Sequence, residues 1–177
     1  MRVIAGTYGG RTLKAPPGAG TRPTSDRVRE ALFSILGARI TGARVLDLFA
    51  GSGALGLEAL SRGADTVTFV DDNRAAIVAI KSNLNALQAV AQVRQTDALR
   101  HLNSARNSGA QYDLVFLDPP YRHAERLAQP LSEALPAVLA PGAVAVAESD
   151  RRAPLALDLP LYDERRYGDT LIRIYGP

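Results

Sequence analysis

The sequence predicts an α/β protein with a Rossmann-like, mostly parallel seven-stranded sheet and helices on both faces. Three observations support this prediction. From residue 44 onward, apolar runs typical of buried strands alternate with segments of helical periodicity. The first of these strands leads into the glycine-rich turn of residues 51–53, directly before a helix. Residues 161–175 resemble a hairpin that would close the sheet with an antiparallel edge.

The N-terminal region is predicted to form a small β-hairpin extension. Residues 2–5 and 11–14 suit two short strands around a glycine-containing turn, and a Pro/Gly loop extends to residue 23. Thr24 or Ser25 can cap a helix that runs to about Leu36, because its apolar residues recur at helical spacing. We therefore expect one domain over residues 1–177, with a hairpin and basic arm in residues 1–23 and a Rossmann-like core in residues 24–177.

The core elements follow one another in βα order. Strands are predicted at residues 45–49, 66–70, 91–95, 112–117 and 143–148, with the hairpin strands at 161–167 and 170–175. Helices are predicted at 54–61, 74–87 and 98–105, and within 126–139, where Pro130 or Pro136 should bend or end the helix. Residues 107–111 are predicted to be a polar loop. Right-handed crossovers bring the carboxyl ends of the parallel strands to one edge, where open α/β sheets bind ligands.

Composition excludes several classes of protein. The 177 residues include no cysteine and two histidines, so we expect neither disulfides nor a metal site. The N-terminus lacks the apolar run of a signal peptide, and no apolar segment approaches the ~18 residues of a membrane span. We expect a soluble cytoplasmic protein without membrane association.

Charge is distributed unevenly along the chain. Residues 1–44 contain eight basic and two acidic residues, a net charge of +6, whereas the remainder has a net charge of −3. A basic arm on a mildly acidic body indicates contact with phosphate. An ordinary solvated arginine-rich segment explains the same pattern.

The tetrapeptide Asp118-Pro119-Pro120-Tyr121 follows the apolar strand of residues 112–117. The two prolines remove two backbone N–H donors and stiffen the loop. The loop therefore presents acceptors, namely the Asp118 carboxylate and the carbonyl groups around Pro119, beside the flat ring of Tyr121. Such a loop suits a planar group with an –NH2, which is found in a nucleobase or a side-chain amide. The alternative is a strand-terminal Asp followed by a structural turn.

Further polar residues follow the other strands. Residues 51–56 match the G-x-G-x-x-G fingerprint of nucleotide-binding turns. Asp71 ends the second strand, where an acid can accept hydrogen bonds from ribose hydroxyls. Asp97 ends the third strand and is a candidate acceptor for an adenine amino group. For Asp71, a solvated turn residue is the alternative.

Asp47 lies inside the first strand, two residues before Phe49. An anion there is poorly placed against a pyrophosphate and suits a ligand with a cationic end, such as the ammonium group of S-adenosylmethionine. The alternative is that Asp47 accepts N–H bonds from the glycine turn, and both can hold together.

These motifs together resemble the class I S-adenosylmethionine-dependent methyltransferases that methylate amino groups. The segment of residues 22–33, which begins Arg22-Pro23-Thr24, narrows the resemblance to the bacterial RsmD family over about residues 2–175, together with residues 4–6 and 167–170. That family methylates guanine N2 in small-subunit (16S) ribosomal RNA. It usually has Glu where this chain has Asp71, whose shorter side chain is expected to reach one ribose hydroxyl.

The resemblance implies roles for individual residues. Catalysis would involve Asp118, Pro119, Pro120 and Tyr121, with Tyr121 stacking on the flipped base. Contacts to S-adenosylmethionine are implied for Asp47, Phe49, Ala50, Gly51, Gly53, Asp71, Asp97, Ala98 and Asp118, with Arg22 and Thr24 closing over its methionine end. Arg2, Arg11, Lys14 and Arg122 would contact RNA phosphates. The implied partner is small-subunit rRNA or an assembling 30S subunit, and the protein is expected to act as a monomer.

Other functions fit part of the pattern. Adenine N6 or a glutamine amide in protein offers the same planar –NH2 to the loop. A nicotinamide- or flavin-dependent oxidoreductase would use the glycine turn, but the chain lacks the expected second domain and catalytic His, Tyr or Lys group. A non-catalytic RNA-binding module would not need an acceptor loop beside a cofactor site.

Overall fold

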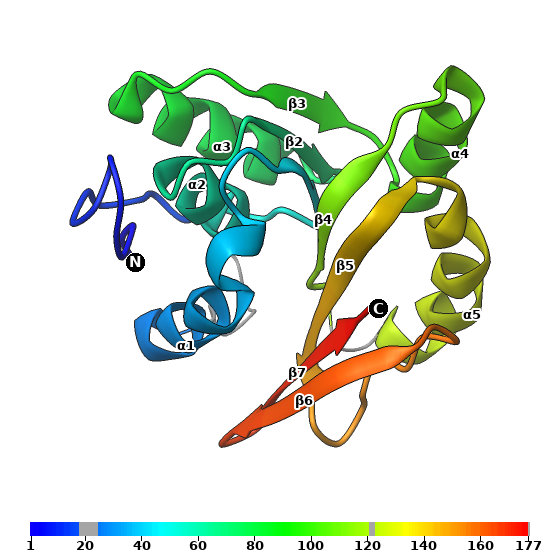
Figure 1. Ribbon diagram of the computed structural model, residues 1–177. Helices are drawn as coiled ribbons and strands as arrows, with labels where there is room; N and C mark the ends of the chain where they lie inside the picture. The colour runs from blue at the N-terminus through cyan, green and yellow to red at the C-terminus, as the bar shows by residue number, and fades with distance from the viewer. Residues whose placement is uncertain (18–24, 121–122, 177) are drawn as a thin grey trace.

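The computed structural model describes residues 1–17, 25–120 and 123–176. These residues form a seven-stranded sheet in the order β3-β2-β1-β4-β5-β7-β6 (Figure 1). Strands β1 to β5 are parallel, and β7 is antiparallel to both of its neighbours, β5 and β6. The predicted sheet with its antiparallel closing hairpin is confirmed. The strand order reverses between β1 and β4, which makes this the point where a ligand crevice is expected.

The elements have the following bounds. The strands are β1 (Arg44–Leu48), β2 (Thr66–Asp71), β3 (Gln92–Gln95), β4 (Tyr112–Leu117), β5 (Leu139–Asp150), β6 (Leu161–Tyr167) and β7 (Thr170–Tyr175). The helices are α1 (Asp26–Leu36), α2 (Ala54–Ser61), α3 (Arg74–Leu87), α4 (Ala98–Ser108) and α5 (Ala124–Ala134), with 3₁₀ turns at Gly37–Arg39 and Leu135–Ala137.

Three boundaries differ from the predictions for physical reasons. Helix α4 continues into the start of the segment predicted as a polar loop and ends at Ser108, where Gly109 caps it with a left-handed φ of 69°. Helix α5 begins at Ala124, before the predicted span, and runs through Pro130. Its end at Ala134, just before the 3₁₀ turn that contains Pro136, agrees with the prediction that the helix ends near one of the two prolines. Strand β5 begins at Leu139, earlier than predicted, because Leu139 pairs with Tyr112 before a register shift.

The predicted N-terminal hairpin is smaller than expected. Its two strands reduce to one antiparallel bridge between Arg2 and Thr12, supported by backbone bonds from Val3 N–H to the Arg11 carbonyl and from Leu13 N–H to the Met1 carbonyl. Residues 1–14 instead lie against α2 and α3, as described below.

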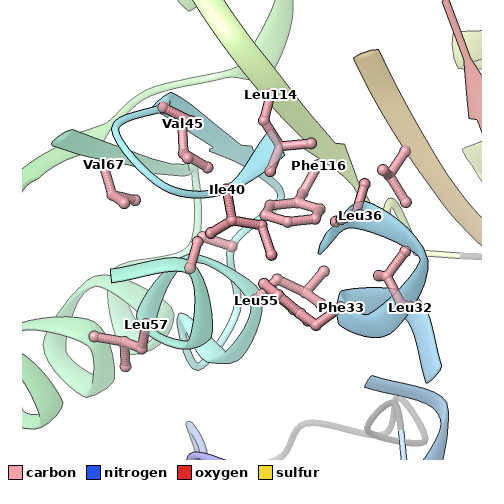
Figure 2. Packing of buried hydrophobic residues seen from close by; sticks show 14 of the residues in the cluster. Leu32, Phe33, Leu36, Ile40, Val45, Leu55, Leu57, Val67, Leu114 and Phe116 are labelled. Atoms are coloured by element: carbon pink, nitrogen blue, oxygen red, sulfur yellow. The ribbon is translucent and has the colours of Figure 1, made fainter. Parts of the chain in front are cut away.

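Helices cover both faces of the sheet, and alternation along the strands assigns each side chain to a face. Helices α1, α2 and α3 share one apolar cluster, whereas α4 and α5 share the other (Figure 1). In the first cluster, Phe33 of α1 packs against Phe116 of β4 with ring centroids 5.7 Å apart (Figure 2). Burial of such side chains is worth about 1.5–3 kcal/mol each. Within the described residues, no helix is long and apolar enough to cross a membrane.

Candidate active site

The glycine turn connects β1 to α2 in a compact backbone conformation. Phe49, Gly51 and Gly53 all have positive φ, at 64°, 57° and 79°. A Cβ added at Gly51 would meet only the Phe49 carbonyl oxygen, 4.0 Å away, so the turn is open on that side. At Gly56 an added Cβ would lie 2.3 Å from the Phe69 ring, because α2 packs closely on β2. The two glycines thus serve different purposes: Gly51 forms an open turn, and Gly56 allows close helix–sheet contact.

Asp47 lies beneath this turn, with 1% of its surface exposed. Its Oδ2 accepts the Gly56 N–H at 2.9 Å, a bond from the first turn of α2, within the G-x-G-x-x-G motif. Burial raises the pKa of Asp47 to about 7, although the Gly56 bond opposes the rise. Its contact with a cationic cofactor group stays a prediction.

Asp71 ends β2 and is half-buried. Its two oxygens accept the N–H groups of Gly51 at 2.8 Å and Asn73 at 2.9 Å. Burial raises the pKa of Asp71, and the two backbone bonds oppose that rise. The carboxylate therefore anchors the glycine turn as well as being the predicted ribose ligand, so its removal would disturb backbone groups that the sequence did not reveal.

Asp97 lies at the exposed end of β3 and caps α4. One oxygen, Oδ1, accepts the N–H groups of Leu99 and Arg100 at 2.9 and 3.1 Å. Ala98, the first residue of that helix, is buried. Ala50 lies in the glycine turn and donates its N–H to the Val70 carbonyl at 3.0 Å. The structure thus brings the predicted cofactor residues of the first three strands to one edge of the sheet.

Asp118 follows β4 at the same edge, beside the reversal of strand order. Leu117 is in register with Ala147 of β5, so the next residues along, Asp118 and Glu148, are neighbours. Burial, then the charges of Glu148 and Asp47, hold the pKa of Asp118 well above its usual range. Pro119 is buried, and the Pro120 carbonyl accepts the His123 N–H at 2.7 Å. Tyr121 and Arg122 lie outside the described residues.

Glu148 is the site residue that sequence reasoning missed. It is 3% exposed and lies on the same face of the sheet as Asp47 and Asp118, since Val146, two residues earlier, is in line with Phe116 and Asp47. The signal was a charged residue near the end of an otherwise apolar strand. No group of acids among the described residues could hold a metal ion.

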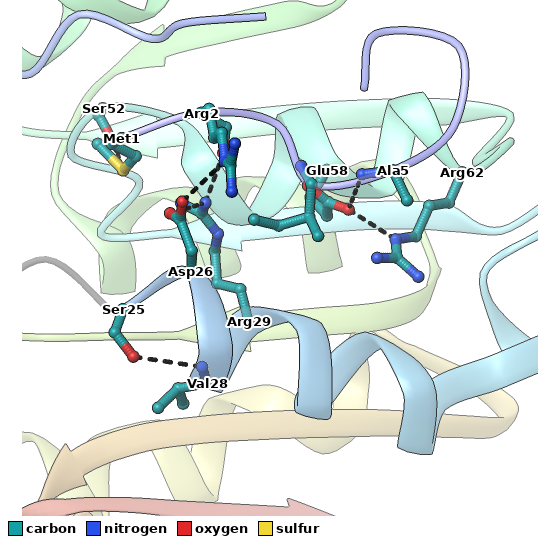
Figure 3. A network of polar contacts seen from close by, with 11 residues as sticks. Met1, Arg2, Ala5, Ser25, Asp26, Val28, Arg29, Ser52, Glu58 and Arg62 are labelled. Atoms are coloured by element: carbon teal, nitrogen blue, oxygen red, sulfur yellow. Dashed lines mark hydrogen bonds and ion pairs between the residues drawn. The ribbon is translucent and has the colours of Figure 1, made fainter. Parts of the chain in front are cut away.

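The N-terminal segment, residues 1–14, is held by buried polar side chains. Glu58 of α2, fully buried, accepts the N–H groups of Ile4 at 2.6 Å and Ala5 at 3.1 Å and pairs with Arg62 (Figure 3). Asn83 of α3 accepts the Lys14 N–H at 2.8 Å and donates to the Ser52 carbonyl at 2.9 Å. The segment is therefore joined to the glycine turn.

Two of the basic residues predicted to contact RNA, Arg2 and Arg11, form intramolecular contacts at different places in the fold. Arg2 forms an ion pair of 3.1 Å with Asp26, and its backbone carbonyl accepts a bond from the buried Arg29. Arg11 donates to the Ala86 carbonyl at 2.7 Å, near the end of α3 that is farthest from the strand carboxyl ends. Arg22 and Thr24 lie outside the described residues.

Sheet order, glycine turn and acceptor loop together define a class I S-adenosylmethionine-dependent methyltransferase fold. A Thermus thermophilus protein of solved structure is similar over 100% of this chain and 99% of its own, at 30% identity and a TM-score of 0.86. A T. thermophilus 16S rRNA N2 G1207 methyltransferase, solved with AdoMet and guanosine, is 25% identical over 92% of this chain and 45% of its own, with a TM-score of 0.73.

The family follows from the sequence match. The model described as "conserved hypothetical protein 95" matches residues 1–176, and the chain belongs to this family, the RsmD family. A Haemophilus influenzae protein named ribosomal RNA small subunit methyltransferase D is 37% identical over 99% of this chain and 93% of its own. The Escherichia coli protein of the same name is 46% identical over 69% of this chain and 61% of its own.

Proposed function

We propose that this chain transfers a methyl group from S-adenosylmethionine to the exocyclic N2 of a guanine in small-subunit rRNA. The observation that supports this most strongly is the position of Asp118, an acid with a raised pKa, beside the glycine turn at the reversal of strand order. Relatives named for small-subunit rRNA methylation support the substrate. We further propose that the protein acts as a cytoplasmic monomer, without membrane association, on free RNA or an assembling 30S subunit.

The residues at the edge fit this cofactor. The open turn at Gly51 leaves room for a ligand, and Asp71 and Asp97 offer acceptors for the ribose and the adenine amine. Bound S-adenosylmethionine supplies an electrophilic methyl group. Asp47 places a buried carboxyl group beneath the turn, suited to a cationic group above it.

Asp118 would act on the substrate amine. The lone pair of a guanine amine is delocalised into the ring, so the amine reacts only when it is well positioned. The Asp118 carboxylate and the Pro119 carbonyl would accept its two N–H bonds. Asp118 would then take up the proton that the amine loses, and its raised pKa suits this role because it makes the carboxylate a stronger base.

Mass mapping of nucleosides tests the proposal. Purified small-subunit RNA incubated with the protein and S-adenosylmethionine should gain N2-methylguanosine at one position, whereas the Asp118→Asn variant should give little product. N6-methyladenosine in place of N2-methylguanosine would replace the guanine assignment by the adenine amine. A melting temperature raised by NAD instead of S-adenosylmethionine would contradict the methyltransferase assignment altogether.

A further inference from the structure

A groove of about 290 Å³ at the antiparallel end of the sheet is lined by four arginines. Arg151 and Arg152 follow β5, Arg166 comes from β6 and Arg173 from β7, with Pro154 and Leu171 between them. Asp150 at the end of β5 is in register with Thr170 at the start of β7, so the groove begins at the same sheet edge as Asp118.

The groove has fewer acidic partners than arginines. Arg151 and Arg152 share a single oxygen of Asp169, at 3.2 and 3.4 Å. Arg166 and Arg173 share Glu164, each at 2.9 Å. Every guanidinium carries five N–H donors, and the ion pairs of Arg151, Arg152 and Arg166 each engage one of them. Arg173 is less accessible, because it is 20% exposed and also bonds Tyr175. The side chains of Arg152 and Arg166 are 72% and 74% exposed, which makes them accessible to a large ligand.

A second cavity connects this groove to the α1 side of the sheet. It has a volume of about 380 Å³ and lies between the start of α1, where the N-cap Ser25 and Val28 line it, and the β6–β7 turn, where Tyr167 and Thr170 line it. Arg151 lines both cavities. Strand β7 is two strands from β4, roughly 10 Å at normal strand spacing. The two cavities therefore adjoin at Arg151, at the same end of the sheet as Asp118.

We propose that the groove lined by Arg151, Arg152, Arg166 and Arg173 binds phosphates of the RNA strand beside the target nucleotide. The inference rests on the proposed function, because it names the surface by which that site holds its substrate. Arginine suits phosphate through its planar, multiply donating head. The excess of guanidinium over carboxylate favours a polyanion, and two adjoining cavities suit a single strand that continues away from a base held at Asp118.

The test is a salt titration of RNA binding by the variant Arg152→Gln with Arg166→Gln. Both side chains are exposed, and neither is among the catalytic or cofactor-binding residues described above. The variant should bind small-subunit RNA more weakly, and the magnitude of its log–log salt slope should fall by roughly 0.7–0.9 for each phosphate that it no longer binds. Its melting temperature and S-adenosylmethionine affinity should match those of the wild type.

Lys81→Gln with Arg106→Gln is the matched control, since it removes the same charge from exposed positions on α3 and α4. Its salt titration should overlay that of the wild type. If the groove variant overlays the wild type, or the control falls equally, the groove does not bind phosphate. Wild-type protein that binds RNA through the groove but methylates no nucleotide would refute the proposed function alone. If the wild-type protein binds RNA without salt dependence, the proposal that the groove binds RNA phosphates is wrong.

Discussion

The two halves of the sheet edge use the same residue type in different surroundings. In the half formed by β2 and β3, Asp71 accepts backbone N–H groups from the glycine turn and from the start of α3, and Asp97 accepts those of the first turn of α4. In the half formed by β4 and β5, Asp118 and Glu148 lie side by side, with Asp47 nearby. Backbone donors stabilise a carboxylate, whereas acidic neighbours favour its protonated form. One half is thus suited to holding a ligand and the other to accepting a proton.

The largest expected effect is on turnover, in the β4–β5 half. Asp118→Asn keeps an acceptor oxygen but removes the base, so turnover should fall by at least ~100-fold. Cofactor affinity, measured by calorimetry, should change little. Asp113→Asn is the control, because Asp113 lies at the other end of the same strand and pairs with Arg44 there. If Asp118→Asn turns over at nearly the wild-type rate, the β4–β5 half of the sheet edge does not supply the proton acceptor, and the proposed difference between the two halves is wrong.

The next effect is on cofactor affinity, in the β2–β3 half. Asp71→Ala should weaken S-adenosylmethionine binding by about 1.5–3 kcal/mol, as for hydrogen bonds to a charged group. The melting temperature should also fall, because the Gly51 and Asn73 N–H groups lose their acceptor. Asp72→Ala, a change at the exposed neighbouring acid, is the control for both measurements. Calorimetry that shows unchanged affinity for Asp71→Ala would restrict Asp71 to its structural bonds.

A smaller effect concerns stability and isolates Asp47, between the two halves. Between the usual pKa of 3.8 and about 7, folded Asp47 binds a proton that the unfolded chain releases. The free energy of unfolding should therefore fall as pH rises through this window. Asp47→Asn removes this proton linkage and can keep the Gly56 bond. Its stability should decline less steeply, by at most ~1.4 kcal/mol per pH unit, in urea titrations.

Asp65→Asn serves as the comparison for this titration, since Asp65 is exposed. Parallel pH dependences for the wild type and Asp47→Asn would show that Asp47 is ionised in the folded protein throughout the window.

Much of this architecture is readable from local pattern. The strands, the glycine turn and the loop at Asp118 each follow from a short stretch of sequence, and parallel connectivity then brings their ends to one edge. Glu148 was missed because its proximity to Asp118 depends on the register of β4 and β5, which no local pattern specifies. Glu58 and Asn83 were missed because a polar helix residue gives no sign that it binds a distant backbone segment.

Net charge along the sequence is also a poor guide to which basic residues are free to bind RNA. The N-terminal arm attracted attention by its net charge, yet Arg2 and Arg11 are engaged with other parts of the protein. Arginines of the groove alternate with acids along the chain, so their local net charge is small. Only the fold reveals that four of them line one groove while their acidic partners are shared.

The pH dependence of single-turnover methyl transfer by Glu148→Gln tests most directly whether Asp118 accepts the proton. The variant removes the negative charge of Glu148 beside Asp118, so the pKa of Asp118 should fall. The charged groups of Asp47, near Asp118, and of Arg29, near Glu148, are unchanged in this variant. With RNA and S-adenosylmethionine saturating, the acidic limb should shift to lower pH relative to the wild type. Glu133→Gln, at an exposed position of α5, should leave the limb in place. An acidic limb that stays unmoved in Glu148→Gln would contradict the assignment of Asp118 as the proton acceptor.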